Sequence, residues 1–477
     1  MTLTTFEIFD ITLLAVLIIF ISIFLYKNKK NLGKDGILIL YRTKWGLKLI
    51  DKVGTKYKKT LKVISYISII TGYLLMMAII YLFGQTVYQY LFNPEIIKNI
   101  RAPPIAPLIP YFPKLFGLQD FFPEFYAIYF VISILIVATV HEFAHGIFSR
   151  RYGVKIKSTG FAFLKFFPAI FGAFVEQDEK KMTKKTKFEQ ISILSSGVFA
   201  NIITAILFVF AILLFFSIAF TPLGVFFDDY FYSIVKVSSI ISINNISVNN
   251  SSYDKVVELI ENKTLNEIKT DNNKYSGIKG FPQDLTLVAL YDDAPAINAG
   301  LIPGEVITEI NGIKIYGKEK LSEELLKYFP GDKITLKIYD GEDIRNHDII
   351  LGKNPQNENM PFLGIGFFNQ ESRGVSGKIY TLISSSFKEP NIYYEPKYGL
   401  SKFIYYLIWW VIIINLLVGL MNMLPVGIFD GGKFFYLTVL GITKSEKGAK
   451  RIFSTVTYLF LFLLLVMMVF WVLSFIK

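Results

Sequence analysis

Two of the three histidines in this 477-residue sequence lie four positions apart, in the segment 140–146. On an α-helix, His141 and His145 would share one face, one turn apart. Two imidazoles at that spacing can bind one zinc ion, and Glu142 beside them can act as a general base. The segment therefore predicts a hydrolytic zinc site. The alternative is a packed pair of core histidines, with Glu142 reaching towards the membrane surface.

A zinc site needs further ligands, and the sequence contains no cysteine. Disulfides, iron–sulfur clusters and thiolate zinc sites are thereby excluded, so a third protein ligand must be His, Asp or Glu. The third histidine, His347, lies in a polar stretch without other ligands at suitable spacing. We therefore expect His347 to be a solvated surface residue.

A polar segment late in the chain, 422–432, interrupts an apolar stretch. Pro425 breaks helical hydrogen bonding, and the glycines of the segment permit sharp turns. Irregular backbone at membrane depth is tolerated where it is buried in protein or lines a wet cavity. Asp430 costs ~3 kcal/mol on insertion scales, a cost that a zinc ion would offset. The alternative is an ordinary helix break that leaves Asp430 in water.

The elements that position these residues are expected to be membrane helices. The chain is 53% hydrophobic and only 18% charged, with a mean hydropathy of +0.46, too apolar for a soluble protein of this length. Six spans are predicted, at 9–26, 61–92, 125–149, 191–220, 402–441 and 453–476. The first is read as an uncleaved span, because its positive charges follow the apolar core.

The net charge of +12 comes largely from Lys and Arg in short loops beside these spans. This is the positive-inside pattern, and no nucleic-acid partner is expected. The basic loops 27–60, 150–190 and 444–451 fall on one side, which should be cytoplasmic. We therefore expect a multi-pass protein of the cell membrane. Its zinc site should lie towards the cytoplasmic half of the bilayer, and the segment 225–400 outside. The Pro-rich segment 93–123 should be an irregular outside loop.

The segment 284–350 has the pattern of a small α+β domain, with strands at 285–290 and 334–338 and a hairpin turned by Asn311-Gly312. The run 294–315 resembles a PDZ domain of the bacterial, circularly permuted kind. The resemblance implies a PDZ-like domain at 284–369 with a peptide-binding loop and edge strand formed by Phe362, Leu363, Gly364 and Ile365. The preceding 225–283 is either a linker or a shortened second PDZ-like unit.

Three ordered motifs resemble the site-2 protease family of intramembrane zinc metalloproteases. They are HExxH at 141–145, Gly197-x-x-x-Asn201, and Asn422-x-x-Pro425-x-x-x-x-Asp430-Gly431. The stretch 160–176 also resembles the membrane-associated strand region of this family. The resemblance implies one Zn²⁺ per chain, held by His141, His145 and Asp430. It also implies a role for Asn201 at the substrate backbone or the oxyanion, with Gly197, Asn422, Pro425 and Gly431 in support. Taken alone, Gly197 and Asn201 would fit an ordinary contact between helices.

These observations predict an α-helical polytopic membrane protein of about six transmembrane helices with an inserted extracytoplasmic α+β PDZ-like domain. The expected activity is zinc endopeptidase cleavage of transmembrane proteins within the lipid bilayer, after a first cut by a site-1-type protease. Two rivals stay open: a catalytically inactive PDZ-bearing adaptor, and a transporter with an ion site at Asp430. The sequence does not predict the oligomeric state.

The expected division of the chain places the two halves of the protease core on either side of the outside domain. It consists of two N-terminal helices with their loops (1–124), the first half of the core (125–224), the segment 225–283, the PDZ-like domain (284–369), a linker (370–401), the second half of the core (402–441) and a last helix (442–477).

Overall fold

The computed structural model describes residues 4–93, 103–105, 107–119, 121–248, 251–260, 266–271, 273–281, 286–367 and 388–473. The chain forms two compact units. One is Met1–Phe215 together with Lys402–Lys477, and the other is Phe216–Ser401. The termini and all the predicted membrane spans belong chiefly to the first unit.

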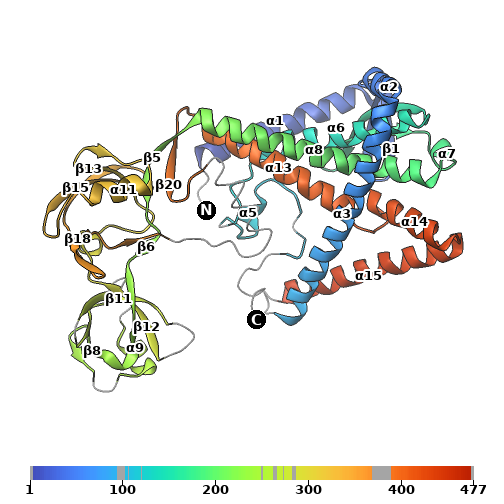
Figure 1. Cartoon of the computed structure of the whole chain (residues 1–477). Coiled ribbons are helices and arrows are strands. Elements are labelled where there is room, and N and C mark those ends of the chain that lie inside the picture. Colours follow the sequence, from blue (N-terminus) through green and yellow to red (C-terminus); the bar gives the residue numbers. More distant parts are fainter. Residues whose placement is uncertain are drawn as a thin grey trace. The chain divides into compact units, whose positions relative to one another are not determined.

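Six helices of the described chain are long and apolar enough to cross a membrane, as predicted, and the protein is an integral membrane protein. They are α1 (Thr5–Lys27), α3 (Lys58–Phe92), α6 (Ala127–Arg151), α8 (Lys187–Ala219), α13 (Ser401–Asn422) and α15 (Glu446–Leu473). Figure 1 shows α8 in green alongside α13 in orange, and Ala205 and Ile212 of α8 pack with Ile412 of α13.

The predicted fifth span is divided into two helices. Helix α13 ends at Asn422, an irregular segment follows, and α14 (Asp430–Thr443) begins after the break predicted from Pro425 and the glycines. A Cβ on Gly431 would lie under 3.0 Å from the Met423 carbonyl group, closer than real side chains approach. The irregular segment therefore folds tightly over the first turn of α14, and only glycine fits there.

A four-stranded antiparallel sheet also belongs to this unit, in the order β1 (Leu32–Asp35), β2 (Leu38–Thr43), β3 (Ile156–Leu164) and β4 (Phe171–Gln177). Strands β3 and β4 are the strand region expected at 160–176, whereas β1 and β2 were not predicted. Helix α1 packs on one face of the sheet through Ile21 and Leu25. Three short elements also belong to this unit: the 3₁₀ turn Lys29–Asn31 and the helices α2 (Leu47–Lys56) and α7 (Glu179–Met182).

The described part of the Pro-rich segment is irregular, as predicted, apart from the short helix α5 (Phe112–Leu115). Its aromatic side chains pack against α6 and α13. The rings of Phe112 and Phe122 lie 5.6 and 6.2 Å from that of Trp410, whose indole N–H donates to the carbonyl oxygen of Glu124 at 3.1 Å. The segment thus joins the N-terminal end of α6 to α13.

The N-terminus of α6 is capped from another helix. Tyr126, at the cap position, makes no side-chain cap bond. The carboxylate of Asp10 in α1 instead accepts the backbone N–H groups of Ala127 and Ile128 at 2.7 and 3.0 Å. Tyr111 donates its hydroxyl to the same carboxylate at 2.6 Å. Asp10 therefore satisfies helix-end donors that a local residue normally satisfies.

The second unit contains a six-stranded antiparallel sheet. Five strands follow the order β16 (Ile344–Ile350), β15 (Lys333–Tyr339), β13 (Val306–Ile310), β5 (Phe220–Phe226) and β20 (Ile392–Pro396), and the sixth, β14 (Ile313–Lys314), pairs with β13. The helices α10 (Pro295–Asn298) and α11 (Lys318–Leu325) pack with it. The β13–β14 turn has positive φ at Asn311 and Gly312, 47° and 81°, as the predicted hairpin requires. Strand β20 lies in the range predicted as a linker.

A second sheet has the order β7 (Tyr232–Lys236), β12 (Leu287–Asp292), β11 (Lys274–Gly280), β10 (Ile268–Thr270), β8 (Ile240–Ile243) and β9 (Ile246–Ser247), with helix α9 (Tyr253–Leu259). The strand expected at 285–290 exists as β12, but it pairs with β7 and β11 and packs Val288 and Leu290 into this sheet's core. The boundary predicted at 284 therefore cuts through a sheet. The segment before it is a folded sheet and not a linker.

Two short ladders complete the unit: β17 (Gly352–Asn354) with β18 (Asn357–Phe362), and β6 (Asp229–Tyr230) with β19 (Ile365–Gly366). The 3₁₀ turn Val237–Ser239 follows β7.

Candidate metal centre

Three electron-pair donors from two helices converge at one point. His141 Nε2 lies 3.2 Å from Asp430 Oδ2, His145 Nε2 lies 3.1 Å from the same oxygen, and the two Nε2 atoms are 3.0 Å apart. Ligand atoms placed ~2.0 Å from a tetrahedral zinc ion are separated by roughly 3.3 Å. The three side chains therefore fit a zinc ion, and their two-imidazole, one-carboxylate set leaves a coordination position for a reactant.

The imidazoles are held by partners at their other ring nitrogens. His145 Nδ1 lies 2.8 Å from the carbonyl oxygen of Ile193, which fixes a proton on Nδ1 and leaves Nε2 as a ligand. His141 Nδ1 lies 3.2 Å from the Asn201 side-chain amide, whose Oδ1 is buried without a hydrogen-bond partner. With a metal on Nε2, His141 would carry its proton on Nδ1. The Asn201 amide, turned over, would accept it through Oδ1 and free its NH₂ as a donor.

Gly197 lies directly against both imidazoles. A Cβ at this position would be 2.5 Å from His145 Nε2 and 2.6 Å from His141 Nε2. A side chain there would occupy the space of the donors themselves. The glycine of the G-x-x-x-N pattern thus allows α8 to pack directly against the two imidazoles.

Glu142, next to His141 on α6, is hydrogen-bonded to the sheet. Its Oε2 accepts the backbone N–H of Val175 in β4 at 3.0 Å. A second hydrogen bond joins β4 to α6: the Ser149 hydroxyl donates to Gln177 Oε1 at 2.6 Å. The carboxylate is half-buried and keeps its other oxygen for a second hydrogen bond.

The sequence pattern of peptidase family M50 matches residues 129–467, a range that contains all three donors and Glu142. The chain belongs to peptidase family M50. The match confirms the resemblance to the site-2 protease family that was based on the three motifs.

Relatives of this M50 family member include an uncharacterized protein of Methanocaldococcus jannaschii, 32% identical over 200 residues, which cover 40% of this chain and 48% of that protein. The zinc metalloprotease RasP of Shouchella clausii is 23% identical over 179 residues, 32% of this chain and 42% of RasP. The chain thus spans about half the length of these relatives. The crystal structure of the PDZ domain of an SdrC-like protein from Listeria monocytogenes matches 15% of this chain and 75% of that domain, at 26% identity and a TM-score of 0.14.

The remaining motif residues of this M50 family member lie around the donors. The side-chain amide of Asn422 is 3.5 Å from His141 Nε2. Pro425 accepts the Thr457 hydroxyl on its carbonyl oxygen at 3.4 Å, which ties the break to α15. Gly431 packs on the Met423 backbone, as described above. Their functional roles stay predictions.

The residues predicted to bind a peptide lie in the second unit. Leu363 and Gly364 accept backbone N–H groups of Ala296 and Phe231 at 2.9 Å each. Gly364 has a φ of 85°, and one edge of β19, which begins at Ile365, is already paired with β6. Phe362 ends β18. Peptide binding at these residues stays a prediction.

Sequence reasoning missed the residues that hold Glu142. A main-chain donor such as Val175 N–H has no side-chain signature. The contacts that Arg42, Trp45 and Gly46 make with the β4 and α6 region join segments about a hundred residues apart.

Proposed function

We propose that this chain is an intramembrane zinc endopeptidase that hydrolyses peptide bonds within or near transmembrane segments. The observation that carries the proposal is the convergence of His141, His145 and Asp430 beside Glu142, in an M50 family member with six candidate membrane helices.

The chain's own residues would divide the chemistry. His141, His145 and Asp430 would hold the zinc ion, which supplies Lewis acidity that activates water and polarises the scissile carbonyl. Glu142 would accept the proton of the attacking water on its carboxylate and deliver it to the leaving nitrogen. The Val175 N–H would orient that carboxylate. The freed Asn201 NH₂ would donate to the oxyanion.

The substrate would be a transmembrane protein segment that unwinds locally. Carbonyl groups within a helix are already hydrogen-bonded and shielded from attack. The basic loops favour a zinc site in the cytoplasmic half of the bilayer and an extracytoplasmic second unit. We propose that the second unit favours substrates already shortened by a site-1-type protease, in a sequence of regulated cleavages.

Replacement of Glu142 by Gln tests the mechanism. The amide keeps the size of the side chain and leaves the three metal ligands in place, but it cannot take a proton. Purified Glu142→Gln protein should retain one zinc per chain, measured by metal analysis. Its cleavage of a single-span membrane substrate should fall by roughly 10²- to 10⁴-fold. Cleavage at the wild-type rate would contradict the mechanism.

A transporter remains the second candidate, because α13 and α14 form a broken helix with an acid at the break. Zinc analysis separates the two. One tightly bound zinc per chain, lost in His145→Ala together with cleavage, favours the peptidase. Ion-coupled uptake that persists without zinc would favour the transporter.

A further inference from the structure

The segment Leu32–Lys56, which we call the N-terminal module, lies outside the range matched by family M50 yet packs on the helix of the metal centre. Its strand β2 pairs with β3 along its whole length, from Leu38 opposite Leu164 to Thr43 opposite Thr159. Its helix α2 lies against α6, where Ile50 is fully buried. A Cβ on Gly146 of α6 would be 3.0 Å from the Ile50 side chain. The packing leaves no free space between the two helices.

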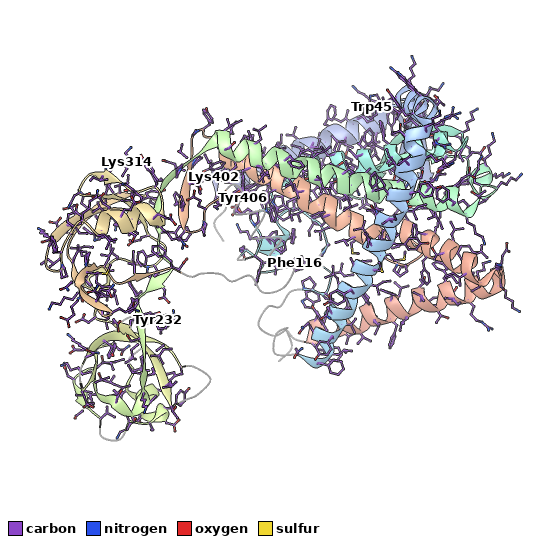
Figure 2. The ribbon with its side chains drawn as sticks, in the orientation of Figure 1. Trp45, Phe116, Tyr232, Lys314, Lys402 and Tyr406 are labelled. Carbon is purple, nitrogen blue, oxygen red and sulfur yellow. The ribbon has the colours of Figure 1, made fainter. Side chains whose placement is uncertain are left out.

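The first contact with the catalytic region is made by Trp45 and Gly46, where α2 begins (Figure 2). The Trp45 ring lies 5.4 Å from that of Phe143, the residue after Glu142. A Cβ on Gly46 would lie under 3.0 Å from the Phe143 ring. Thr159 of β3 donates its hydroxyl to the Trp45 carbonyl oxygen at 2.6 Å, which fixes this corner to the sheet. The half-buried Phe143 ring therefore packs against the module.

The second contact reaches Glu142 through β4. Arg42 of β2 donates from Nε to the Glu176 carboxylate at 3.0 Å, and Ser158 donates to the same oxygen at 2.7 Å. The Ser158 hydroxyl and the Arg42 guanidinium hold the pKa of Glu176 below its ordinary value. Glu176 directly follows Val175, the residue whose N–H binds Glu142. The Gln177 side chain bonds Ser149 of α6, and successive side chains of a strand point to opposite faces, so Glu176 and its partner Arg42 lie on the face of β4 away from α6.

Phe143, the residue after Glu142, thus contacts the N-terminal module directly, and the Val175 N–H that binds Glu142 is linked to the module through the Arg42–Glu176 ion pair. We propose that this module positions the general base Glu142, with Gly46 and Arg42 as its positioning residues. The inference rests on the proposed function. It assigns a role in catalysis to a segment of the chain that carries none of the motifs of the family.

A positioning role changes the rate of the chemical step, whereas simple stabilisation changes only how much protein is folded. Misplacing a catalytic group by about 1 Å lowers the rate of the chemical step by up to roughly 100-fold. The metal ligands and the substrate-binding surfaces would be untouched. The expected signature is therefore a lower kcat with unchanged KM and unchanged zinc content.

Gly46→Ala and Gly36→Ala form a matched pair. Both glycines lie in the module with positive φ, 79° and 57°, so alanine strains both backbones similarly. A Cβ on Gly36 meets nothing within 4 Å, whereas a Cβ on Gly46 collides with Phe143. We expect Gly46→Ala to lower kcat by about 10-fold or more at wild-type KM and one zinc per chain, and Gly36→Ala to stay within about twofold of wild type. The double variant Gly46→Ala/Phe143→Ala should be no slower than Phe143→Ala alone, because the collision is then absent.

Arg42→Ala and Glu176→Gln test the second contact. Each should lower kcat about 10-fold with zinc retained, and the double variant should be no worse than either one, because both remove the same link. Arg42→Lys, which keeps the charge, should recover part of the loss. Lys34→Ala, on the exposed edge strand β1, serves as the control and should leave kcat unchanged.

The outcomes separate this inference from the proposed function. If wild-type protein holds zinc but cleaves no membrane substrate, the proposed function fails. If wild-type protein cleaves, and Gly46→Ala matches Gly36→Ala in kcat, the positioning role is overturned while the peptidase stands. Loss of zinc or a raised KM in folded Gly46→Ala protein, judged by its thermal midpoint in detergent, would also overturn it.

Discussion

Gly197 shows how closely α8 must approach the metal ligands. Because a Cβ there would lie 2.5 Å from His145 Nε2, Gly197→Ala should displace an imidazole. We expect the zinc affinity to fall by roughly 10- to 100-fold, the range found when the partners of metal ligands are disturbed. Metal content after dialysis against a graded chelator measures this. Gly84→Ala in α3, where a Cβ meets nothing within 4 Å, should keep its zinc; equal loss in both would show a general effect of alanine.

Asn201 offers a way to separate metal binding from catalysis. With zinc bound, its Oδ1 would accept from His141 Nδ1 and its NH₂ would face the reaction. Asn201→Asp keeps an acceptor for His141 but has no donor, so zinc should be retained while kcat falls by roughly 100-fold or more. Asn201→Ala removes the acceptor as well and should also weaken zinc binding. Metal analysis beside kcat measures both. Full activity in Asn201→Asp would contradict a donor role.

At the scale of residues, the sequence predicted the part of the metal site that is formed by neighbouring residues. His141 and His145 are linked by helical spacing, which can be read directly from the chain. Asp430 lies 285 residues beyond His145, and only the resemblance to a family made it a ligand. The Val175 N–H could not be predicted, because every residue except proline carries that donor. Which N–H meets Glu142 depends on the register of β4 against α6.

The helices were the most predictable elements. Five of the six predicted spans correspond to one helix each and the fifth to α13 and α14, because length and hydropathy determine what can cross a bilayer. The break before Asp430 was also predictable, because Pro and Gly have strong local effects. Strands β1 and β2 were not predicted. They are short and contain the basic residues Lys34 and Arg42. They join the sheet because β2 pairs with β3, more than a hundred residues away.

The cap on α6 gives a prediction at the scale of elements. Asp10→Ala leaves the N–H groups of Ala127 and Ile128 without an acceptor, and a lost N-cap costs ~1 kcal/mol. The thermal midpoint of the purified protein in detergent should fall. Asp10→Asn should fall less, because its amide oxygen can still accept from Ala127 and Tyr111 although its NH₂ cannot accept from Ile128. An equal fall in both variants would show that charge, and not capping, matters.

At the scale of the whole molecule, the Phe216–Ser401 unit is inserted in the chain between α8, which carries Asn201, and α13, which leads to Asp430. The sequence predicted this insertion and the hairpins within it, because turns such as Asn311-Gly312 are local. It did not predict which strands share a sheet. Strand β5 directly follows α8, and strand β20 precedes α13. The two strands pair with each other although Ile392 lies 166 positions after Phe226 in the chain. Pairings between such distant strands depend on the packing of the complete unit.

That ladder allows the unit to be removed cleanly. Val225 pairs with Ile392, and Phe226 donates its N–H to the carbonyl oxygen of Asn391 at 3.0 Å. Replacing residues 227–390 by Asn-Gly would turn β5 and β20 into a hairpin with a two-residue turn, the type this dipeptide favours. The chain between α8 and α13 would remain closed, and every metal ligand and its partners would be kept.

The shortened protein tests the proposed restriction of access. If the second unit excludes membrane proteins with intact outside domains, its removal should leave one zinc per chain and the rate on a trimmed substrate within about twofold. Cleavage of the untrimmed form should rise about 10-fold or more, because a steric barrier costing ~1.4 kcal/mol accounts for a tenfold difference. Paired assays on the same substrate, with and without its outside domain, measure the ratio, and Glu142→Gln in the shortened protein controls for contaminating proteases. An unchanged ratio with zinc retained would show that the unit does not select substrates by size. Loss of zinc would show that the unit supports the fold of the metal centre.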